Sequence, residues 1–264
     1  MKRQKTISTI IYHVLVAAAS VGMLYPLLWM LGSSFKPNNE IFTSVERLIP
    51  KTFTLENYVN GWRGFAGLSF AVFFKNSFFV AIIASLGATL SSAVVAFGLA
   101  RLRFPGRKVW FIAMIVTMML PGQVMMIPRF VLFNKFGWVD SYMPFWVPAL
   151  LACYPFFIYQ LIQFMRGIPR DLDESACIDG CGTFRIFWQI LLPLMKPALF
   201  SAGLFQFLWT YNDYFNSLIF INSVKKYTIS LALRLSVDAE SVVVWGRVMA
   251  MACVAVLPLV LLFF

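Results

Sequence analysis

The sequence predicts an all-α polytopic membrane protein with six transmembrane helices, because of its composition and the length of its apolar runs. Of the 264 residues, 60% are hydrophobic, 17% aromatic and 12% charged, and the mean hydropathy is +0.78. A soluble domain has about a quarter charged residues, and the polar groups here are too few to cover a folded surface in water. Lipid is therefore the expected solvent, which excludes a cytosolic enzyme and a disordered tail.

Six apolar runs are long enough to cross a bilayer, which takes about 20 mostly apolar residues of helix. They are residues 10–31, 76–99, 109–127, 143–165, 198–221 and 246–264. The first run follows three basic residues and could be a signal peptide. It has no small-residue cleavage site before Phe35 and Lys36, so we expect a retained helix.

Two of the runs carry packing or bending signals. Small residues recur every four positions in the second run, which places them on one face for close helix packing: Ala84, Ala88, Ser92 and Ala96. Near the end of the third run, Pro121 and Gly122 free backbone carbonyls. They indicate either a kink beside a cavity or a simple helix end.

Basic residues predict the orientation, because cytoplasmic loops are enriched in Lys and Arg. With the N-terminus inside, the inner segments hold eleven such residues in about 45 positions, and the outer segments hold nine in about 86. We therefore expect both termini to be cytoplasmic. The net charge of +11 follows from these membrane flanks, and nucleic acid is not an expected partner.

Residues 166–197, between the fourth and fifth runs, read as a helix, a glycine turn and a second helix. Pro169 is expected to open the first helix and Gly180 to end it. Acidic residues fill its first turn, as the helix dipole favours: Asp171, Asp173 and Glu174. Thr183 is expected to cap the second helix, and Pro193 to end it.

The second of these helices is expected to expose apolar side chains: Phe184, Phe187, Trp188 and Ile190. A segment of about 30 residues is too small to fold alone. It must dock on a partner, or else lie as an elbow in the headgroup layer.

This segment resembles the EAA loop of ABC importer permeases. The matching residues are Glu174-Ser175-Ala176, Asp179-Gly180, Ile190, Leu192, Pro193 and Pro197. Ser175 replaces the usual middle alanine, and Cys181 replaces the usual small residue after the glycine. Both are mild departures from the pattern.

More of the chain is similar to the smaller permease subunit of maltose-type carbohydrate importers. The similar stretches are Ser34 to Pro37, Glu40 to Phe42, Asn57-Tyr58, Asn76-Ser77, Ala100-Arg101, Phe104 to Arg107, Met119 with Pro121, Ile127-Pro128 and Trp209 to Asp213. Family members normally continue past the sixth helix into a short tail, whereas this sequence stops at Phe264. The resemblance covers nearly the whole chain.

The resemblance implies the type I ABC importer permease fold, with residues 1–264 as a single transmembrane permease domain. It implies import of a sugar or oligosaccharide by alternating access across the bacterial cytoplasmic membrane. It assigns coupling to the ATPase to Glu174, Ser175, Ala176, Asp179, Gly180, Leu192 and Pro193. The implied partners are a second permease subunit in a heterodimer, two ATP-binding subunits and an extracytoplasmic solute-binding protein.

The chain itself lacks the residues of an enzyme. No G-x-x-x-x-G-K-[ST] occurs, so ATP and Mg are expected only on the partner ATPase. Cys177 and Cys181 lack a third metal ligand, and His13 is the single histidine, so neither a metal site nor histidine-based catalysis is expected. Four scattered cysteines, including Cys153 and Cys253, also exclude a secreted disulfide scaffold.

The fifth run supplies the candidate substrate pathway. Four polar residues share one helical face: Gln206, Thr210, Asp213 and Ser217. Trp209 and Tyr214 flank them. Such a row suits transient contacts with sugar hydroxyls and ring faces, but polar groups also bond neighbouring helices. Both interpretations stay open, as do a neutral and an acidic sugar.

An ion-coupled secondary transporter of a small polar solute is the alternative function. Its proton or ion relay would need ionisable groups inside the helices, and Asp213 and His13 are the candidates. No inverted repeat of the kind found in such carriers is evident. The segment 166–197 would also have no role in this alternative.

Overall fold

The computed structural model describes residues 2–238 and 243–263, and within these residues it contains helices and no strand. Four helical segments are long and apolar enough to cross a membrane: Thr9–Ser34, Phe70–Arg101, Met143–Arg166 and Trp245–Leu262. Two bent helix pairs bring the number to six when each counts as one span: Arg107–Met118 with Gly122–Lys135, and Thr183–Leu194 with Lys196–Tyr211. The predicted all-α membrane fold class is confirmed.

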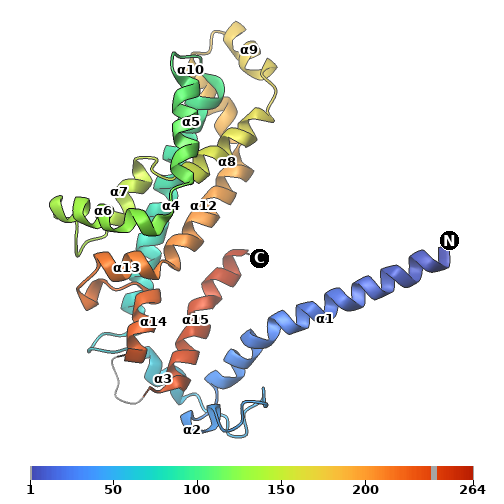
Figure 1. Ribbon diagram of the computed structural model, residues 1–264, viewed down its shortest axis with the longest axis vertical. Coiled ribbons are helices and arrows are strands. Elements are labelled where there is room, and N and C mark those ends of the chain that lie inside the picture. Colours follow the sequence, from blue (N-terminus) through green and yellow to red (C-terminus); the bar gives the residue numbers. More distant parts are fainter. Residues whose placement is uncertain (1, 239–242, 264) are drawn as a thin grey trace. The chain divides into compact units, whose positions relative to one another are not determined.

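The contacts divide the chain into two compact units (Figure 1). The end unit comprises Met1–Ala71 and Leu233–Phe264, and the central unit comprises Val72–Ala232. Each unit is described by itself below. The single permease domain inferred from the resemblance stays a prediction.

In the end unit, the last helix packs against the first elements of the chain. Its helices are α1 (Lys2–Ser34), α2 (Asn38–Ile41), α3 (Glu56–Trp62) and α15 (Trp245–Phe263), and α15 contacts the other three. Lys36 is fully buried, and its Nζ donates to the carbonyl oxygens of Ser44 at 3.1 Å and Arg47 at 2.6 Å. The first apolar run is therefore a helix whose C-terminal end is held by a hydrogen-bonded loop.

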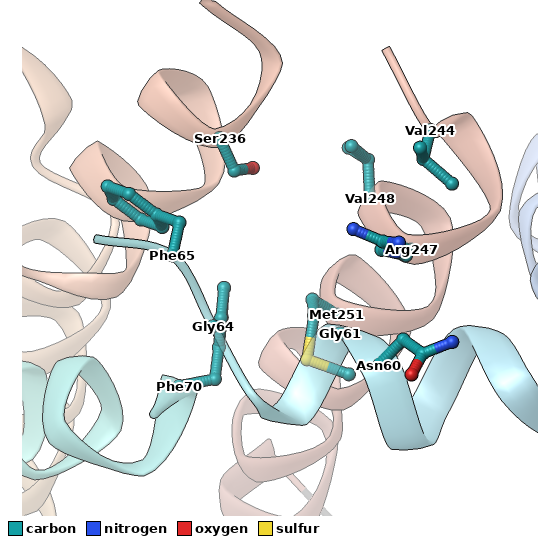
Figure 2. Close-up of a pocket in the computed structure, with 10 residues that line it drawn as sticks. All are labelled: Asn60, Gly61, Gly64, Phe65, Phe70, Ser236, Val244, Arg247, Val248 and Met251. Carbon is teal, nitrogen blue, oxygen red and sulfur yellow. The ribbon is translucent and has the colours of Figure 1, made fainter. Parts of the chain in front are cut away.

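A small pocket of about 30 Å³ lies in this unit (Figure 2). Gly61 of α3 lines it opposite Arg247 and Met251 of α15. A Cβ added at Gly61 would lie 2.9 Å from Met251 Cε. Glycine therefore permits the close approach of α3 to α15.

In the central unit, a long helix with a small-residue face forms the packing surface. This helix is α4 (Phe70–Arg101). Ala84, Ala88, Ser92 and Ala96 on it are each 0% exposed, so the predicted packing face is confirmed. The neighbouring Ser85 donates its hydroxyl to the carbonyl oxygen of Gly203, at 2.5 Å, which brings another helix backbone close to α4.

The third apolar run is broken, and the expected continuous helix over 109–127 is wrong. α5 (Arg107–Met118) ends before α6 (Gly122–Lys135) begins, and the two are bent by 102°. Pro121 is the N-cap of α6 and has extended dihedral angles. Proline lacks an N–H and disfavours helix in the residue before it, so the helix-end interpretation of Pro121 holds.

The fourth and fifth runs are also interrupted. The helices are α7 (Met143–Leu150), α8 (Pro155–Arg166), α12 (Lys196–Tyr211) and α13 (Tyr214–Phe220). Ala152, between α7 and α8, has a left-handed φ of 55°. Asn212 and Asp213 separate α12 from α13, so the expected continuous helix over 198–221 is wrong.

Asp140 ties together two loops of the central unit: its own loop, before α7, and the loop that contains the short helix η2 (Val224–Lys226). Helix α14 (Ile229–Asp238) follows η2. The Asp140 carboxylate accepts hydrogen bonds from the Ser223 N–H at 2.8 Å and hydroxyl at 2.6 Å. Lys226 Nζ lies 3.1 Å from the same carboxylate. The hydrogen bonds from Ser223, together with that from Lys226, hold the pKa of Asp140 below its usual range.

Candidate functional site

The first half of the segment 166–197, called the inner segment below, is helix α9 (Asp171–Ile178). Three acidic residues fill its first turn, as predicted: Asp171, Asp173 and Glu174. The helix begins after Arg170, so Pro169 precedes it rather than opening it. This start places the acidic residues directly at the positive end of the helix dipole.

Gly180 ends this helix in the left-handed conformation, with φ of 80°, which confirms the predicted glycine turn. The Gly180 N–H donates to the Cys177 carbonyl at 3.0 Å, and the Cys181 N–H donates to the Ala176 carbonyl at 2.8 Å. These two bonds form a Schellman motif, which satisfies the last carbonyls of the helix.

The second half of the inner segment differs from the prediction at both ends. It comprises α10 (Thr183–Arg185), the π-helical turn η1 (Ile186–Leu191) and α11 (Leu192–Leu194). Gly182 is the N-cap, and no side chain caps the helix, so the predicted Thr183 cap is wrong. Extended backbone at Gly182 places Thr183 already inside the helix.

Pro193 was expected to end this helix, but it lies inside α11. The wider π turn before it shifts the backbone hydrogen-bond pairing, which accommodates a residue without an N–H. The helix ends at Leu194 instead, and α12 then departs at 76°.

The inner segment docks on the central unit through an apolar side. Five of its residues are buried in a cluster with residues of α4, α8 and α12: Ala176, Ile186, Phe187, Leu191 and Met195. The rings of Phe187 and Phe97 are 4.9 Å apart. The predicted exposure of Phe187 is therefore wrong, because α4 covers it. Ile190 is partly buried, whereas Phe184 and Trp188 are exposed, by 76% and 43%.

A partly buried ion pair anchors the start of α9, with the Asp173 side chain 19% exposed. Arg101 Nη1 at the end of α4 lies 3.3 Å from Asp173 Oδ2, and the Arg101 side chain is 6% exposed. Arg101 Nη2 donates to the carbonyl oxygens of Met165 at 2.9 Å and Ile168 at 2.8 Å. The sequence interpretation missed this role, because it depends on a partner far along the chain.

The predicted coupling residues divide into an exposed and a buried group. Glu174, Ser175, Asp179, Gly180 and Pro193 are exposed, Leu192 is partly buried and Ala176 is buried. Ile178, which sequence reasoning did not single out, is 87% exposed. Figure 1 shows α9 and α10 together at one end of the central unit. This end therefore presents both acidic and apolar side chains.

The predicted pathway residues do not share one straight helix face. Gln206 and Thr210 are buried on α12, and Gln206 Nε2 donates to Thr210 Oγ1 at 2.9 Å. Asp213 lies after the break and caps α13 through the Asn216 N–H at 3.0 Å. Ser217 donates to the Asp213 carbonyl at 2.6 Å. The helix break between Thr210 and Asp213 overturns the single continuous face.

The flanking aromatic residues lie in different surroundings. Trp209 is 49% exposed, and its ring centroid is 5.2 Å from that of Phe156 and 5.1 Å from that of Phe157. Tyr214 is half-buried beside Phe215. The aromatic surface next to the polar pair on α12 is thus provided by Trp209.

No metal-binding group is found within the residues that the structure describes: no three His, Cys, Asp or Glu side chains lie close enough to hold an ion. The candidate site has two parts. One is the docked inner segment with its exposed acidic and apolar side chains, and the other is the polar and aromatic region on α12 and α13.

Comparison with known proteins identifies relatives along the chain. The family model described as binding-protein-dependent transport system inner membrane component matches residues 92–264. The trehalose/maltose transport system permease protein MalG of Thermococcus litoralis is 28% identical, over 98% of this chain and 92% of the relative. The sn-glycerol-3-phosphate transport system permease protein UgpE of Brucella abortus is 30% identical, over 99% of this chain and 94% of the relative.

One solved structure matches almost the whole fold. It is a chain of a bacterial ABC transporter involved in the import of the acidic polysaccharide alginate. The TM-score is 0.86 at 20% sequence identity, and the match covers 99% of this chain and 95% of the other. At this identity the match shows a shared fold.

Proposed function

The chain belongs to the family of binding-protein-dependent transport system inner membrane components, and from this premise we propose that it is the permease subunit of an ATP-driven ABC importer. In this proposal, it moves a sugar or oligosaccharide across the cytoplasmic membrane by alternating access. Ligands shift the equilibrium between the inward-open and outward-open states only through different affinities for these two states. The solute-binding protein would act on the outer side and ATP on the inner side.

The observation that carries this proposal is the way in which the inner segment is docked on the central unit. Its buried apolar residues are docked on the central unit, while Ile178 and Phe184 are exposed on the same segment as the exposed acidic residues Glu174 and Asp179. A segment held in place with an uncovered apolar face fits a protein partner. We assign that face to an ATP-binding subunit, one of two in the complex, which carries ATP and Mg.

The proposed cargo rests on the relatives and on α12. MalG is named for trehalose and maltose, and the structural neighbour takes part in alginate import. The exposed Trp209 ring offers an apolar face on the same helix as the buried Gln206–Thr210 pair, and an apolar face combined with polar groups suits a sugar. We propose Asp213, Tyr214 and Ser217 as the continuation of this pathway.

The test of function is uptake of a labelled sugar panel by the reconstituted complex. We expect ATP-driven uptake of an oligosaccharide, and an ATPase rate that rises with loaded binding protein. In Gln206→Ala, uptake should fall about tenfold, the equivalent of one lost hydrogen bond of about 1.4 kcal/mol. Asp213→Asn keeps an acceptor for the Asn216 N–H at the α13 cap, but it removes the charge and the second oxygen, which accepts from Asn216 Nδ2.

Three outcomes contradict parts of this proposal. Uptake of peptides or metals instead of sugars would overturn the substrate class. Unchanged transport in both variants would assign the α12 residues to helix packing. An ATPase rate that ignores binding protein and substrate would favour the ion-coupled secondary transporter.

The proposed orientation, with both termini cytoplasmic, is tested by cysteine labelling in intact cells. In a background with the four native cysteines replaced, we expect an impermeant maleimide to label Phe53→Cys but not Arg103→Cys. Both positions are exposed on the protein, so membrane sidedness alone should decide the result. Arg103→Cys should react after permeabilisation. The reverse pattern would overturn the topology.

A further inference from the structure

A basic pocket of about 590 Å³ lies at the start of α5 in the central unit. Four cationic side chains line it, and no acidic residue does: Arg103, Arg107, Lys108 and Arg170. In the part of the chain that the structure describes, none of the four forms an ion pair with a carboxylate. The pocket therefore concentrates positive charge that no carboxylate of the described residues pairs with.

The local structure makes this charge unfavourable without a ligand. Arg107 and Lys108 occupy the first turn of α5, which contains no acidic residue. Cations at a helix N-terminus are opposed by the helix dipole. Arg107 is nevertheless held there by a hydrogen bond to the Leu102 carbonyl at 3.0 Å, and Arg170 by one to the Ala100 carbonyl at 3.3 Å. An anion would relieve both the mutual repulsion and the conflict with the dipole.

An apolar pocket of about 560 Å³ adjoins the basic one, between α4, α5 and α8. Phe104 lines both pockets. Trp110 lines the apolar pocket, and a Cβ added at Gly106, in the basic pocket, would lie 3.7 Å from its ring. The two pockets are therefore neighbours, one cationic and one apolar, with the Phe104 side chain lining both.

We propose that this site binds an anionic phospholipid, with the phosphate among the four cations and an acyl chain along the apolar pocket. Guanidinium and ammonium groups donate charge-assisted hydrogen bonds to phosphate. Trp110 is 66% exposed at the junction, as expected for an aromatic residue at the headgroup boundary. A soluble anion or an acidic protein surface would leave the apolar half unused, which favours lipid.

The test is native mass spectrometry of the purified full chain with equal amounts of dioleoylphosphatidylglycerol and dioleoylphosphatidylcholine. We expect a preference for phosphatidylglycerol. Arg103→Gln with Lys108→Gln leaves the bonds of Arg107 and Arg170 in place, and should reduce this preference on the order of 20-fold, at about fivefold per cation. The matched control, Arg63→Gln with Lys135→Gln, removes the same charges elsewhere and should leave the preference unchanged.

A second variant tests the apolar half of the site. Gly98 lines that pocket, and a Cβ added there meets no atom within 4 Å. Gly98→Leu should therefore fill the pocket without a backbone clash and weaken phosphatidylglycerol binding several-fold.

Equal effects of the two charge variants, or equal binding of the two lipids, would overturn the proposal. The variant Arg103→Gln with Lys108→Gln is also tested for copurification of the ATP-binding subunit. An unchanged lipid preference with loss of that copurification would instead assign the cations to the ATP-binding subunit. Because lipid binding is measured without transport, its failure is distinguishable from failure of the proposed function.

Discussion

Replacing Gly180 by leucine should abolish ATP-driven uptake and weaken association of the ATP-binding subunit, while the membrane-spanning helices still insert. Gly180 has φ of 80° and closes the Schellman motif of α9. A residue with a Cβ in this conformation costs about 1–2 kcal/mol. Relaxation of the strained turn would move the exposed Asp179 and Ile178. Copurification of the ATP-binding subunit and uptake by the reconstituted complex are the two measurements.

Two matched variants separate backbone strain from added bulk. Gly182 also has open space around an added Cβ, but its φ is −72°, so Gly182→Leu should retain coupling. Gly180→Asn should be milder than leucine, because asparagine tolerates the left-handed conformation. Full uptake and full association in Gly180→Leu would reduce the inner segment to an elbow in the headgroup layer.

Arg101→Gln should release the inner segment from the central unit. Removing one partner of a fully buried ion pair typically costs about 3–5 kcal/mol, and Asp173, whose side chain is 19% exposed, should retain a part of this cost. Arg101 also bonds the carbonyls of Met165 and Ile168, so its loss frees both the start of α9 and the end of α8. We expect a lower thermal unfolding midpoint in detergent and faster tryptic cleavage within the inner segment.

The exposed pair Arg47 and Glu46 supplies the control for this variant. Their side chains lie 3.9 Å apart and are 55% and 74% exposed, so Arg47→Gln should cost at most about 1 kcal/mol. Combining Arg101→Gln with Asp173→Asn should recover part of the loss, because no charge then remains unpaired. If Arg101→Gln were no worse than Arg47→Gln, the ion pair would not hold the segment.

Local patterns in the sequence were sufficient for much of the fold. The alanine and serine spacing along α4 predicted its buried face, because the periodicity of a single helix determines which residues share a face. Gly180 was predictable for the same reason, since its φ depends on a single turn. In contrast, the break at Asn212 and Asp213 was missed, because these two polar residues were assigned to one face of a continuous helix or to its neighbours and not to a helix end.

Features that depend on distant residues were not predictable. Burial of Phe187 requires Phe97 of α4, and the role of Arg101 requires Asp173 far along the chain. Pro193 lies within the helix because a π turn precedes it, and no residue type signals such a turn. The placement of the proposed ATPase contact therefore depends on tertiary packing as well as on its local motif.

The end unit combines the two ends of the sequence, and this determines the order in which the protein is completed during synthesis. α1 and α3 precede the central unit along the chain, whereas their packing partner α15 follows it. The central unit is continuous in sequence and can be completed before α15 emerges from the ribosome. Until then α1 is a solitary helix in lipid, which its exposed apolar surface tolerates. Arrival of α15 is thus the step that gives α1 and α3 their packing partner.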